Sequence, residues 1–349
     1  MKKISVGILG ATGMVGQKFV ELLSDHPWFE IAALAASDRS VGKPYAEAMR
    51  WSMPTALQQN IANMKVVACN PGLPCNIVFS GLDSSVAGNI ESTFATAGYK
   101  VISNSSNHRM ASDVPLLIPE VNSDHLGLLK HQGYNKGALI TNPNCSVVGI
   151  AMVLKPLLDR WGIEAVNVVT MQALSGAGYP GVPSMDILDN VIPFIGGEEA
   201  KVESEPLKIL GVLQGNQILP YPMRFSAQCT RVSVSDGHLA CLSVKLKKKA
   251  DAKQIIAAWQ EFEGEPQRLK LPMAPKRPII YLDDEKHPQP KLHRNLEEGM
   301  AVSVGRLREC SLFDWKFVIL SHNTVRGAAG CAILNAELMA KKGYLGEMK

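Results

Sequence analysis

The chain of 349 residues lacks several features that would assign it to a class of protein at once. No apolar run is long enough to span a bilayer, so no membrane helix is predicted. The cysteines form no CxxC pair and the histidines no HxxxH or HExxH pattern, so no metal site is expected. Lys and Arg total 36 against 32 Asp and Glu, a bias too small to indicate a nucleic acid or an acidic membrane as partner.

The first residues, MKKISVGILG, lack the long apolar stretch of a signal peptide, and the seven cysteines are an odd number. Both observations favour a reducing compartment, and we expect a cytoplasmic protein. With 46% apolar residues the chain can bury more than one core, and its length favours two domains.

Within the first hundred residues, short apolar runs alternate with segments of helical spacing. Strands are predicted at 4–10, 30–36, 76–82 and 99–105, with helices at 13–23 and 84–98. Strands without a polar face are typical of parallel sheets covered on both sides. The pattern predicts a doubly wound, Rossmann-like α/β domain with a mostly parallel sheet.

After residue 160 the runs are longer and partly alternating, with strands predicted at 163–174, 229–237 and 238–249. They indicate a second, α+β domain with a largely antiparallel sheet. Residues 323–345 have helical spacing and are expected to return to the first domain. We therefore predict one domain formed by 1–144 and 322–349, and another formed by 145–321.

A glycine-rich turn, GATGMVG at 10–16, follows the first predicted strand and opens a helix. Glycines in that position let the backbone approach a pyrophosphate, which then lies against the free N–H groups of the helix. Thr12 stands where the dinucleotide fingerprint has its middle glycine, so this is a variant of that motif. Close packing of helix on strand is the alternative explanation.

The second strand ends in Ser37-Asp38-Arg39-Ser40. An acid there would bind the ribose 2′-hydroxyl of NAD, whereas hydroxyls and Arg would hold a 2′-phosphate. Because Ser37, Arg39, Ser40 and Lys43 together offer cations and donors, NADP is favoured over NAD.

Cys145, in TNPNCSVVG at 141–149, follows residues that end a strand and precedes helical spacing. At a helix N-terminus a thiol pKa falls, which would make Cys145 a nucleophile near neutral pH. The same N–H groups could stabilise an oxyanion on a substrate carbonyl. A small buried thiol is the alternative.

The segment RVSVSDGH at 231–238 supplies two further groups. Arg231 suits a carboxylate, and a neutral His238 suits general base chemistry near pH 7. Each residue alone is as easily structural.

Several motifs in this order resemble the aspartate-β-semialdehyde dehydrogenases, specifically their archaeal and fungal branch. The resemblance covers essentially the whole chain. The motifs that carry it are GATGMVG, SDRSVGKPY (37–45), SNSSNHRM (103–110), TNPNCSVVG, MQALSGAGYPG (171–181), GGEEAK (196–201), CTRVSVSDGH (229–238) and HNTVRGAAG (322–330).

The resemblance implies NADP-dependent reductive dephosphorylation of aspartyl phosphate to aspartate semialdehyde, in lysine, methionine and threonine biosynthesis. Cys145 would attack the acyl phosphate and form a thioacyl enzyme, with His238 as the acid/base residue and Gln172 orienting the substrate. Phosphate is the other small-molecule partner, and the second domain would assemble the chain into a homodimer or homotetramer.

Binding residues are also implied position by position. Arg231 and Glu198 would hold the substrate's α-carboxylate and α-ammonium, and Arg109 and Lys201 the phosphate. The expected NADP-binding residues are Gly10, Thr12, Gly13, Met14, Val15, Ser37, Arg39, Ser40, Ser80, Gly81, Ser175, Gly176 and Asn323.

Three other functions compete with this one. An archaeal malonyl-CoA reductase shares the glycine turn and the thioacyl chemistry but lacks the EExK arrangement that this chain has at 198–201. A non-catalytic nucleotide-binding homologue would have no need to keep both Cys145 and His238. A cysteine hydrolase would not require the GATGMVG turn.

Overall fold

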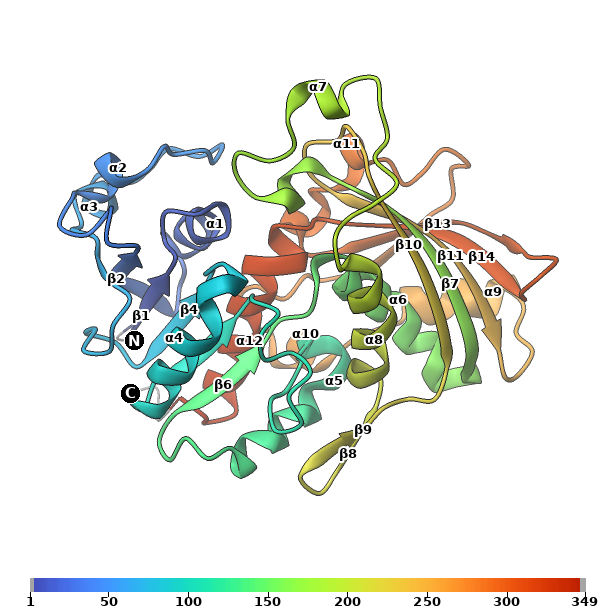
Figure 1. The fold of residues 1–349 in the computed structure, drawn as a ribbon. Helices are drawn as coiled ribbons and strands as arrows, with labels where there is room; N and C mark the ends of the chain where they lie inside the picture. The colour runs from blue at the N-terminus through green and yellow to red at the C-terminus, as the bar shows by residue number, and fades with distance from the viewer. Residues whose placement is uncertain (1–2, 346–349) are drawn as a thin grey trace.

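The computed structural model describes residues 3–345 and contains two six-stranded sheets (Figure 1). The first has the order β3-β2-β1-β4-β5-β6, and its strand pairs are all parallel. Its strands are β1 (Ile4–Leu9), β2 (Phe29–Ala36), β3 (Val67–Ala68), β4 (Ile77–Ser80), β5 (Lys100–Ser103) and β6 (Ala138–Thr141). The strand order reverses between β1 and β4, which is where ligands of open α/β sheets bind.

Helices on this sheet include α1 (Met14–Leu23) and α4 (Ser84–Thr96). The C-terminal helix α12 (Gly330–Lys341) also packs here, because Ile333 and Leu334 share a core with Ile8 and Phe19. The return of the last helix to the parallel sheet is thereby confirmed. It is preceded by one turn of π-helix, η4 (Val325–Ala329), rather than starting at 323. Shorter segments complete this region: α2 (Tyr45–Ala48), α3 (Gln59–Ala62), α5 (Pro119–Asn122) and η1 (Ser123–His131).

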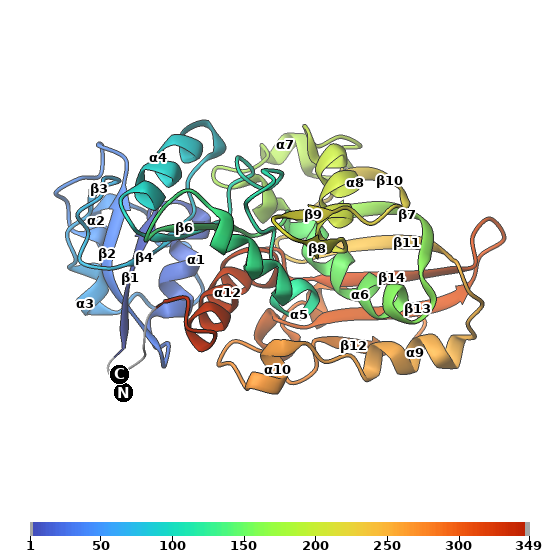
Figure 2. The same cartoon turned by 90° about the horizontal axis from the view of Figure 1, so that it is seen from below.

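The second sheet is mixed, with the order β10-β7-β11-β14-β13-β12 (Figure 2). Both end pairs are parallel and the three inner pairs are antiparallel, which confirms a largely antiparallel second sheet. Its strands are β7 (Ile163–Gln172), β10 (Arg224–Arg231), β11 (His238–Leu246), β12 (Ile279–Leu282), β13 (Val302–Glu309) and β14 (Trp315–Ser321).

One face of the mixed sheet is covered by α6 (Cys145–Trp161), α8 (Glu198–Ile209) and α9 (Ala252–Gln260). Val148, Val202 and Trp259 from these helices share one core with strand residues such as Val168 and Phe317. Figure 1 shows α8 on the side of this sheet that faces the first one. The start of α6 and one face of α8 therefore meet the carboxyl ends of the parallel strands.

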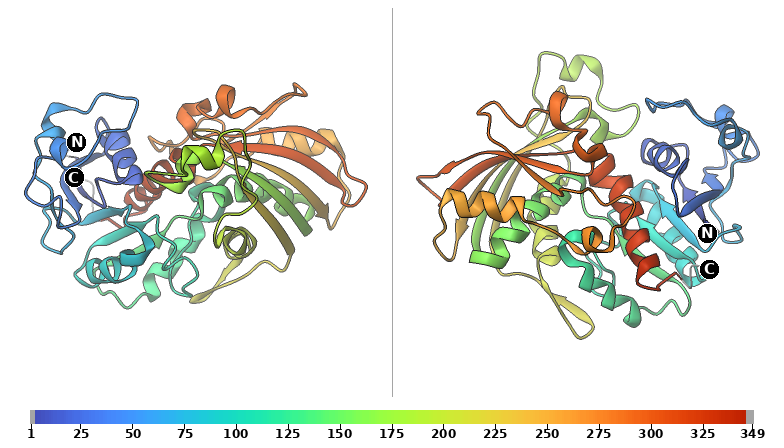
Figure 3. Two further views of the ribbon diagram at one scale, coloured as in Figure 1. Left: turned by 45° about the horizontal axis from the view of Figure 1, so that its top comes forward. Right: turned by 180° about the vertical axis from the view of Figure 1, so that it is seen from behind.

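The remaining segments connect these layers: η2 (Leu174–Ala177), α7 (Ser184–Ile187), α10 (Glu265–Leu269), α11 (Pro290–His293) and η3 (Leu296–Gly299). The hairpin of β8 (Val212–Gln214) and β9 (Gln217–Leu219) projects from the body of the molecule (Figures 1 and 3). Across residues 3–345, no helix has the length and apolar character needed to cross a bilayer.

One predicted strand is wrong in extent. The strand predicted at 229–237 both begins and ends earlier in the structure, because β10 runs from Arg224 to Arg231. Residues 232–237 instead form a loop that accepts two main-chain hydrogen bonds from η2. The Leu174 N–H donates to the Val234 carbonyl and the Ser175 N–H to the Ser235 carbonyl. The apolar alternation of this segment reflects that partial pairing.

Candidate active site

The glycine-rich turn links β1 to α1 at the reversal of strand order. Gly10 has φ +73°, and a Cβ there would lie 2.8 Å from the Gly81 carbonyl oxygen. Gly16 packs still closer, because its Cβ would meet the Gly10 oxygen at 2.2 Å. Gly13 is different, since only that same oxygen lies near it, at 3.5 Å. Gly10 and Gly16 therefore close the turn, and Gly13 leaves room beside the free N–H groups of α1.

A cavity of about 450 Å³ opens over this turn. It is lined by Thr12, Gly13 and Met14 and by Ser37, Arg39 and Ser40 from the end of β2. Lys43 and Arg50 add two further cations, whereas Asp38 does not line it. Three cations together with the hydroxyls of Ser37 and Ser40 suit a phosphate monoester better than a ribose diol. Together with the open turn, this donor set fits a dinucleotide that carries a 2′-phosphate.

A second cavity of about 500 Å³ shares Met14 with the first and extends to Cys145. Most of the remaining predicted site residues line it: Val15, Arg109, Cys145, Ser175, Gly176, Glu198, Lys201, Arg231 and Asn323. Five predicted residues do not. Gln172 and His238 are buried, Gly10 belongs to the turn, Gly81 packs against Gly10, and Ser80 is fully buried at the end of β4.

Cys145 is the first residue of α6, as the sequence predicted. Asn144 caps the helix, with its Oδ1 accepting from the Ser146 N–H at 2.9 Å. On its other side Cys145 touches η4: a Cβ on Gly327 would lie 2.8 Å from the Cys145 oxygen and 2.9 Å from its Cβ. Only a glycine lets the π-helical turn approach the nucleophile so closely.

The thiol and the imidazole are in direct contact. Cys145 Sγ lies 3.2 Å from His238 Nε2, and the Ala173 N–H donates to His238 Nδ1 at 3.0 Å. Since Nδ1 accepts a hydrogen bond, the neutral ring carries its proton on Nε2, facing the sulfur. Burial, Arg231 and His322 lower the pKa of His238 to about 3, so the ring is neutral at pH 7.

The thiol does not behave as the helix dipole alone suggests. Burial, and secondarily Glu198, raise the pKa of Cys145 to about 12, although Arg109 and Arg231 act in the opposite direction. The expectation of a lowered thiol pKa is therefore wrong. Desolvation of the sulfur and a carboxylate nearby outweigh the N–H groups of α6.

Hydrogen bonds to Asn323 and Arg294 hold the loop that precedes His238. Asn323 Oδ1 accepts from the Gly237 N–H at 2.9 Å, and its Nδ2 donates to Ser175 Oγ at 2.8 Å. Arg294 donates to Ser235 Oγ at 3.0 Å. Asn323 thus joins the two loops that flank the thiol.

The groups predicted to hold the substrate form one polar cluster. Glu198 Oε1 accepts from Gln172 Nε2 at 3.0 Å and from Asn144 Nδ2 at 2.8 Å, and Oε2 lies 3.6 Å from Lys201 Nζ. Arg231 donates from Nη1 to the Ala173 carbonyl at 2.7 Å, which leaves other N–H groups for the cavity. Together with Arg109, the charged groups of this cluster line one cavity, to which they present three cations and one carboxylate.

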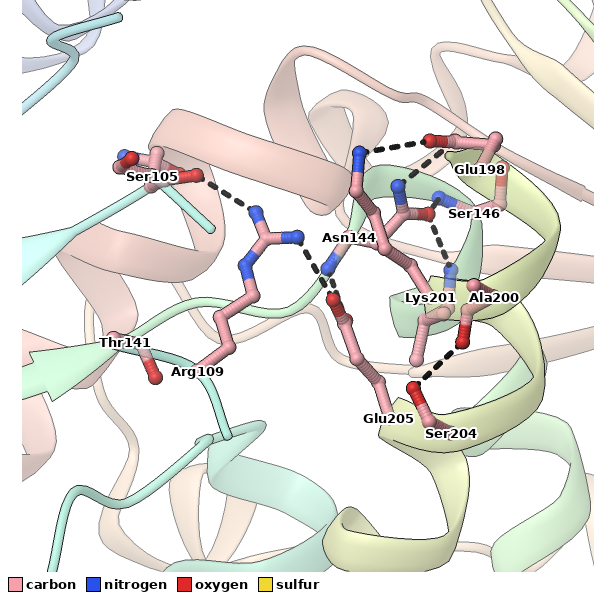
Figure 4. A network of polar contacts seen from close by, with 12 residues as sticks. Ser105, Arg109, Thr141, Asn144, Ser146, Glu198, Ala200, Lys201, Ser204 and Glu205 are labelled. Atoms are coloured by element: carbon pink, nitrogen blue, oxygen red, sulfur yellow. Dashed lines mark hydrogen bonds and ion pairs between the residues drawn. The ribbon is translucent and has the colours of Figure 1, made fainter. Parts of the chain in front are cut away.

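Other residues of the site were not found by sequence reasoning. Glu205 and Lys208 lie on α8 beyond Lys201 and contact the Arg109 segment. Figure 4 shows the contact of Glu205. Arg50 and Tyr179 line the cofactor cavity. Polar residues at i, i+3 and i+7 of a helix usually indicate a solvated face, so the spacing of Glu198, Lys201 and Glu205 gave no distinguishing signal.

Comparisons with known proteins agree with this geometry. Residues 5–129 match the family described as semialdehyde dehydrogenase, NAD binding domain, and residues 154–326 match semialdehyde dehydrogenase, dimerisation domain. The aspartate-semialdehyde dehydrogenase of Schizosaccharomyces pombe is 52% identical over 97% of this chain and 99% of its own. That of Archaeoglobus fulgidus is 48% identical over 97% and 99%.

Among solved structures, aspartate semialdehyde dehydrogenase with NADP from Candida albicans has a TM-score of 0.91 and 42% identity, over 98% of this chain and 100% of that one. The relatives match over nearly the full length of the chain at 42–52% identity. A cysteine and a histidine also lie in contact near a dinucleotide-binding turn. Both observations support the same family. The chain belongs to the aspartate-semialdehyde dehydrogenase family.

Proposed function

We propose that the chain catalyses the NADP-dependent interconversion of aspartyl phosphate with aspartate semialdehyde and phosphate, through a thioester on Cys145. The observation that carries this proposal is the 3.2 Å contact between Cys145 Sγ and His238 Nε2 beside a cavity lined by Arg109, Arg231 and Glu198.

The charges of that cavity match the substrate. Arg231 suits the α-carboxylate, and Glu198 the α-ammonium group. Arg109 and Lys201 suit the phosphate, whose negative charge grows as the acyl bond breaks. A malonyl-CoA substrate has no amino group to pair with Glu198, which disfavours the acyl-CoA reductase alternative.

In the reductive direction the sulfur forms a bond to the acyl carbon, and the bond from that carbon to the phosphate oxygen breaks. Because the thiol is protonated at rest and His238 is neutral, the thiol proton finally resides on the departing phosphate. His238 donates a hydrogen bond from Nε2 to the sulfur, and this bond stabilises the sulfur when it is a thiolate. A general-base role would first require breaking the Ala173 hydrogen bond to Nδ1.

The reduced cofactor, when bound, supplies the hydride that converts the thioester to the aldehyde. The residues suited to hold its pyrophosphate are Thr12 and Gly13 with the N–H groups of α1, and its 2′-phosphate would lie among Ser37, Arg39 and Ser40. Ser175 and Asn323, which hydrogen-bond each other beside Cys145, would flank the nicotinamide.

Three broader features belong to this proposal. Residues 1–144 with 322–349 would form the cofactor-binding domain, and 145–321 the catalytic one. The chain would work in the cytoplasm, where the pathways to lysine, methionine and threonine use its product. Its assembly would be a homodimer or homotetramer, formed through the second domain.

The test is NADP reduction with aspartate semialdehyde and phosphate. Continued turnover by the wild-type protein should require both substrates, and Cys145→Ser should lose activity at least a thousandfold while its affinity for NADP changes less than twofold. Equal activity of the Ser variant would contradict the covalent mechanism. Activity with malonyl-CoA and NADPH, but none with the semialdehyde, would instead establish the acyl-CoA reductase.

A further inference from the structure

Glu205 joins the phosphate side of the site to the residue that precedes the nucleophile. Its Oε1 accepts from Arg109 Nη1 at 2.9 Å, and its Oε2 accepts from the Asn144 N–H at 2.6 Å. The Glu205 side chain is only 2% exposed. Figure 4 shows its carboxylate between these two donors, one turn of α8 beyond Lys201. One buried carboxylate therefore sets the spacing between the Arg109 guanidinium and the start of α6.

The hydrogen bond from Arg109 to Glu205 fixes how the guanidinium faces the cavity. Arg109 Nη2 donates to the Asn104 carbonyl at 2.7 Å, so the two terminal nitrogens are held by different partners. Within residues 3–345, the Nε–H is buried and has no acceptor. Two of the five N–H groups of the guanidinium are thus used for orientation and the Nε–H is buried, which leaves one N–H on each terminal nitrogen for an anion.

Lys208, one turn further along α8, holds the main chain of the same segment. Its Nζ donates to the carbonyls of Arg109, Ala111 and Val114 at 2.7, 2.6 and 2.8 Å. Arg109 is therefore tied to α8 at both its backbone and its side chain. Lys208 fixes the main chain around Arg109, whereas Glu205 fixes the orientation of the Arg109 guanidinium.

Asn144 is tied to the same helix from the other direction. Glu205 accepts from its main-chain N–H, Glu198 accepts from its side-chain amide, and its Oδ1 caps α6. A shift of the Glu205 carboxylate would therefore move the cap of the helix that begins with Cys145.

We propose that Glu205 is a positioning residue for the reaction. It holds the phosphate-binding guanidinium of Arg109 in the correct position relative to the Cys145 thiol. This inference rests on the proposed function, because it takes the anion at Arg109 to be the phosphate of that reaction.

Two other roles would give different results. If Glu205 merely tempered the charge of Arg109, replacing it with a neutral side chain would leave a stronger cation and would tighten phosphate binding. If Glu205 served only the fold, its loss would lower stability and all kinetic constants together. A positioning role predicts weaker phosphate binding although the site becomes more positive.

The experiment compares Glu205→Gln, Glu205→Asp and Glu203→Gln. Gln keeps the shape but has one acceptor oxygen for two donors. Asp keeps the charge but is one methylene shorter and cannot reach both donors. Glu203 is the matched control on the same helix, because its Oε1 accepts from the main-chain N–H of Ala227 at 3.0 Å and not from the site.

For both Glu205 variants we expect the KM for phosphate to rise at least tenfold, and the KM for aspartate semialdehyde to change less than threefold. Glu203→Gln should change neither more than twofold. In an Arg109→Ala background, Glu205→Gln should change the remaining phosphate KM less than twofold, because Glu205 acts through Arg109.

A phosphate KM that falls or stays constant in Glu205→Gln, or wild-type behaviour of Glu205→Asp, would overturn the proposal. Failure of both variants to give folded enzyme by circular dichroism would assign Glu205 to folding and overturn it as well. A wild-type enzyme without phosphate-dependent NADP reduction would refute the proposed function instead, whatever the variants do.

Discussion

Replacing Gly327 with Ala should damage the active site directly, because the added methyl would point at the backbone of Cys145. The new Cβ would lie 2.8 Å from the Cys145 oxygen, whereas ordinary contacts begin near 3.4 Å, so η4 and α6 must separate by about 0.6 Å. Overpacking of this kind costs about 1–3 kcal/mol of stability. Each kcal/mol lowers the Tm of a 349-residue protein by roughly 1–2 °C.

The same movement should lower catalysis. Cys145 Sγ lies 3.2 Å from His238 Nε2, so a shift of several tenths of an ångström weakens that hydrogen bond and misdirects the sulfur. Since a displacement of about 1 Å can cost 10²-fold in rate, we expect kcat to fall by roughly tenfold or more. The KM for NADP should stay within twofold, because the glycine turn at Thr12 and Gly13 is untouched.

The assay is NADP reduction together with thermal unfolding, and Gly133→Ala is the control. Gly133 has no atom within 4 Å of an added Cβ and no positive φ, so this variant should keep wild-type activity and Tm. Wild-type kcat and Tm in Gly327→Ala would refute the reasoning from close packing.

Three further predictions follow from the same contacts. Because burial raises the pKa of Cys145 to about 12, its alkylation by iodoacetamide should accelerate about tenfold per pH unit from pH 7 to 9. A plateau of the alkylation rate below pH 8 would instead show that Cys145 is a thiolate in the free enzyme. The rate is followed on the Cys145 peptide by mass spectrometry, because Cys241 is exposed and also reacts. Arg39→Leu should raise the KM for NADP at least tenfold and change that for NAD less than twofold, and equal effects on both cofactors would remove Arg39 from the 2′-phosphate site. Asn323→Ala removes the hydrogen bonds to Gly237 and Ser175, so it should lower kcat about tenfold and the free energy of unfolding, measured by urea titration, by about 1 kcal/mol. An unchanged kcat would contradict the role of Asn323 in holding the loop before His238.

Local patterns predicted strands β1, β2, β4 and β5 of the parallel sheet, but not the two-residue strand β3. Its strands are continuous apolar runs, and the turn at 10–16 and the helix start at Cys145 have strong local signals in glycine, proline and asparagine. The segment after Arg231 was predicted less well, because its alternating residues pair only partly, with a loop rather than with a strand. Alternation alone cannot distinguish these two partners.

Features that depend on packing between distant segments were not predictable. The polar face of α8 resembles a solvated surface in the sequence, yet Glu205 and Lys208 are buried against the segment around Arg109. The pKa of Cys145 was mispredicted for the same reason. A helix start is visible in the sequence, but the desolvation of its first side chain depends on η4, β11 and α8 closing around it.

The covalent intermediate on Cys145 is the central claim, and mass spectrometry tests it most directly. The enzyme is mixed with aspartate semialdehyde and NADP without phosphate, quenched in acid and digested. We predict that the peptide containing Cys145 gains one aspartyl group, in step with a burst of NADPH, and that added phosphate removes it. NADPH formation with an unmodified Cys145, or with the adduct on another residue, would contradict the mechanism.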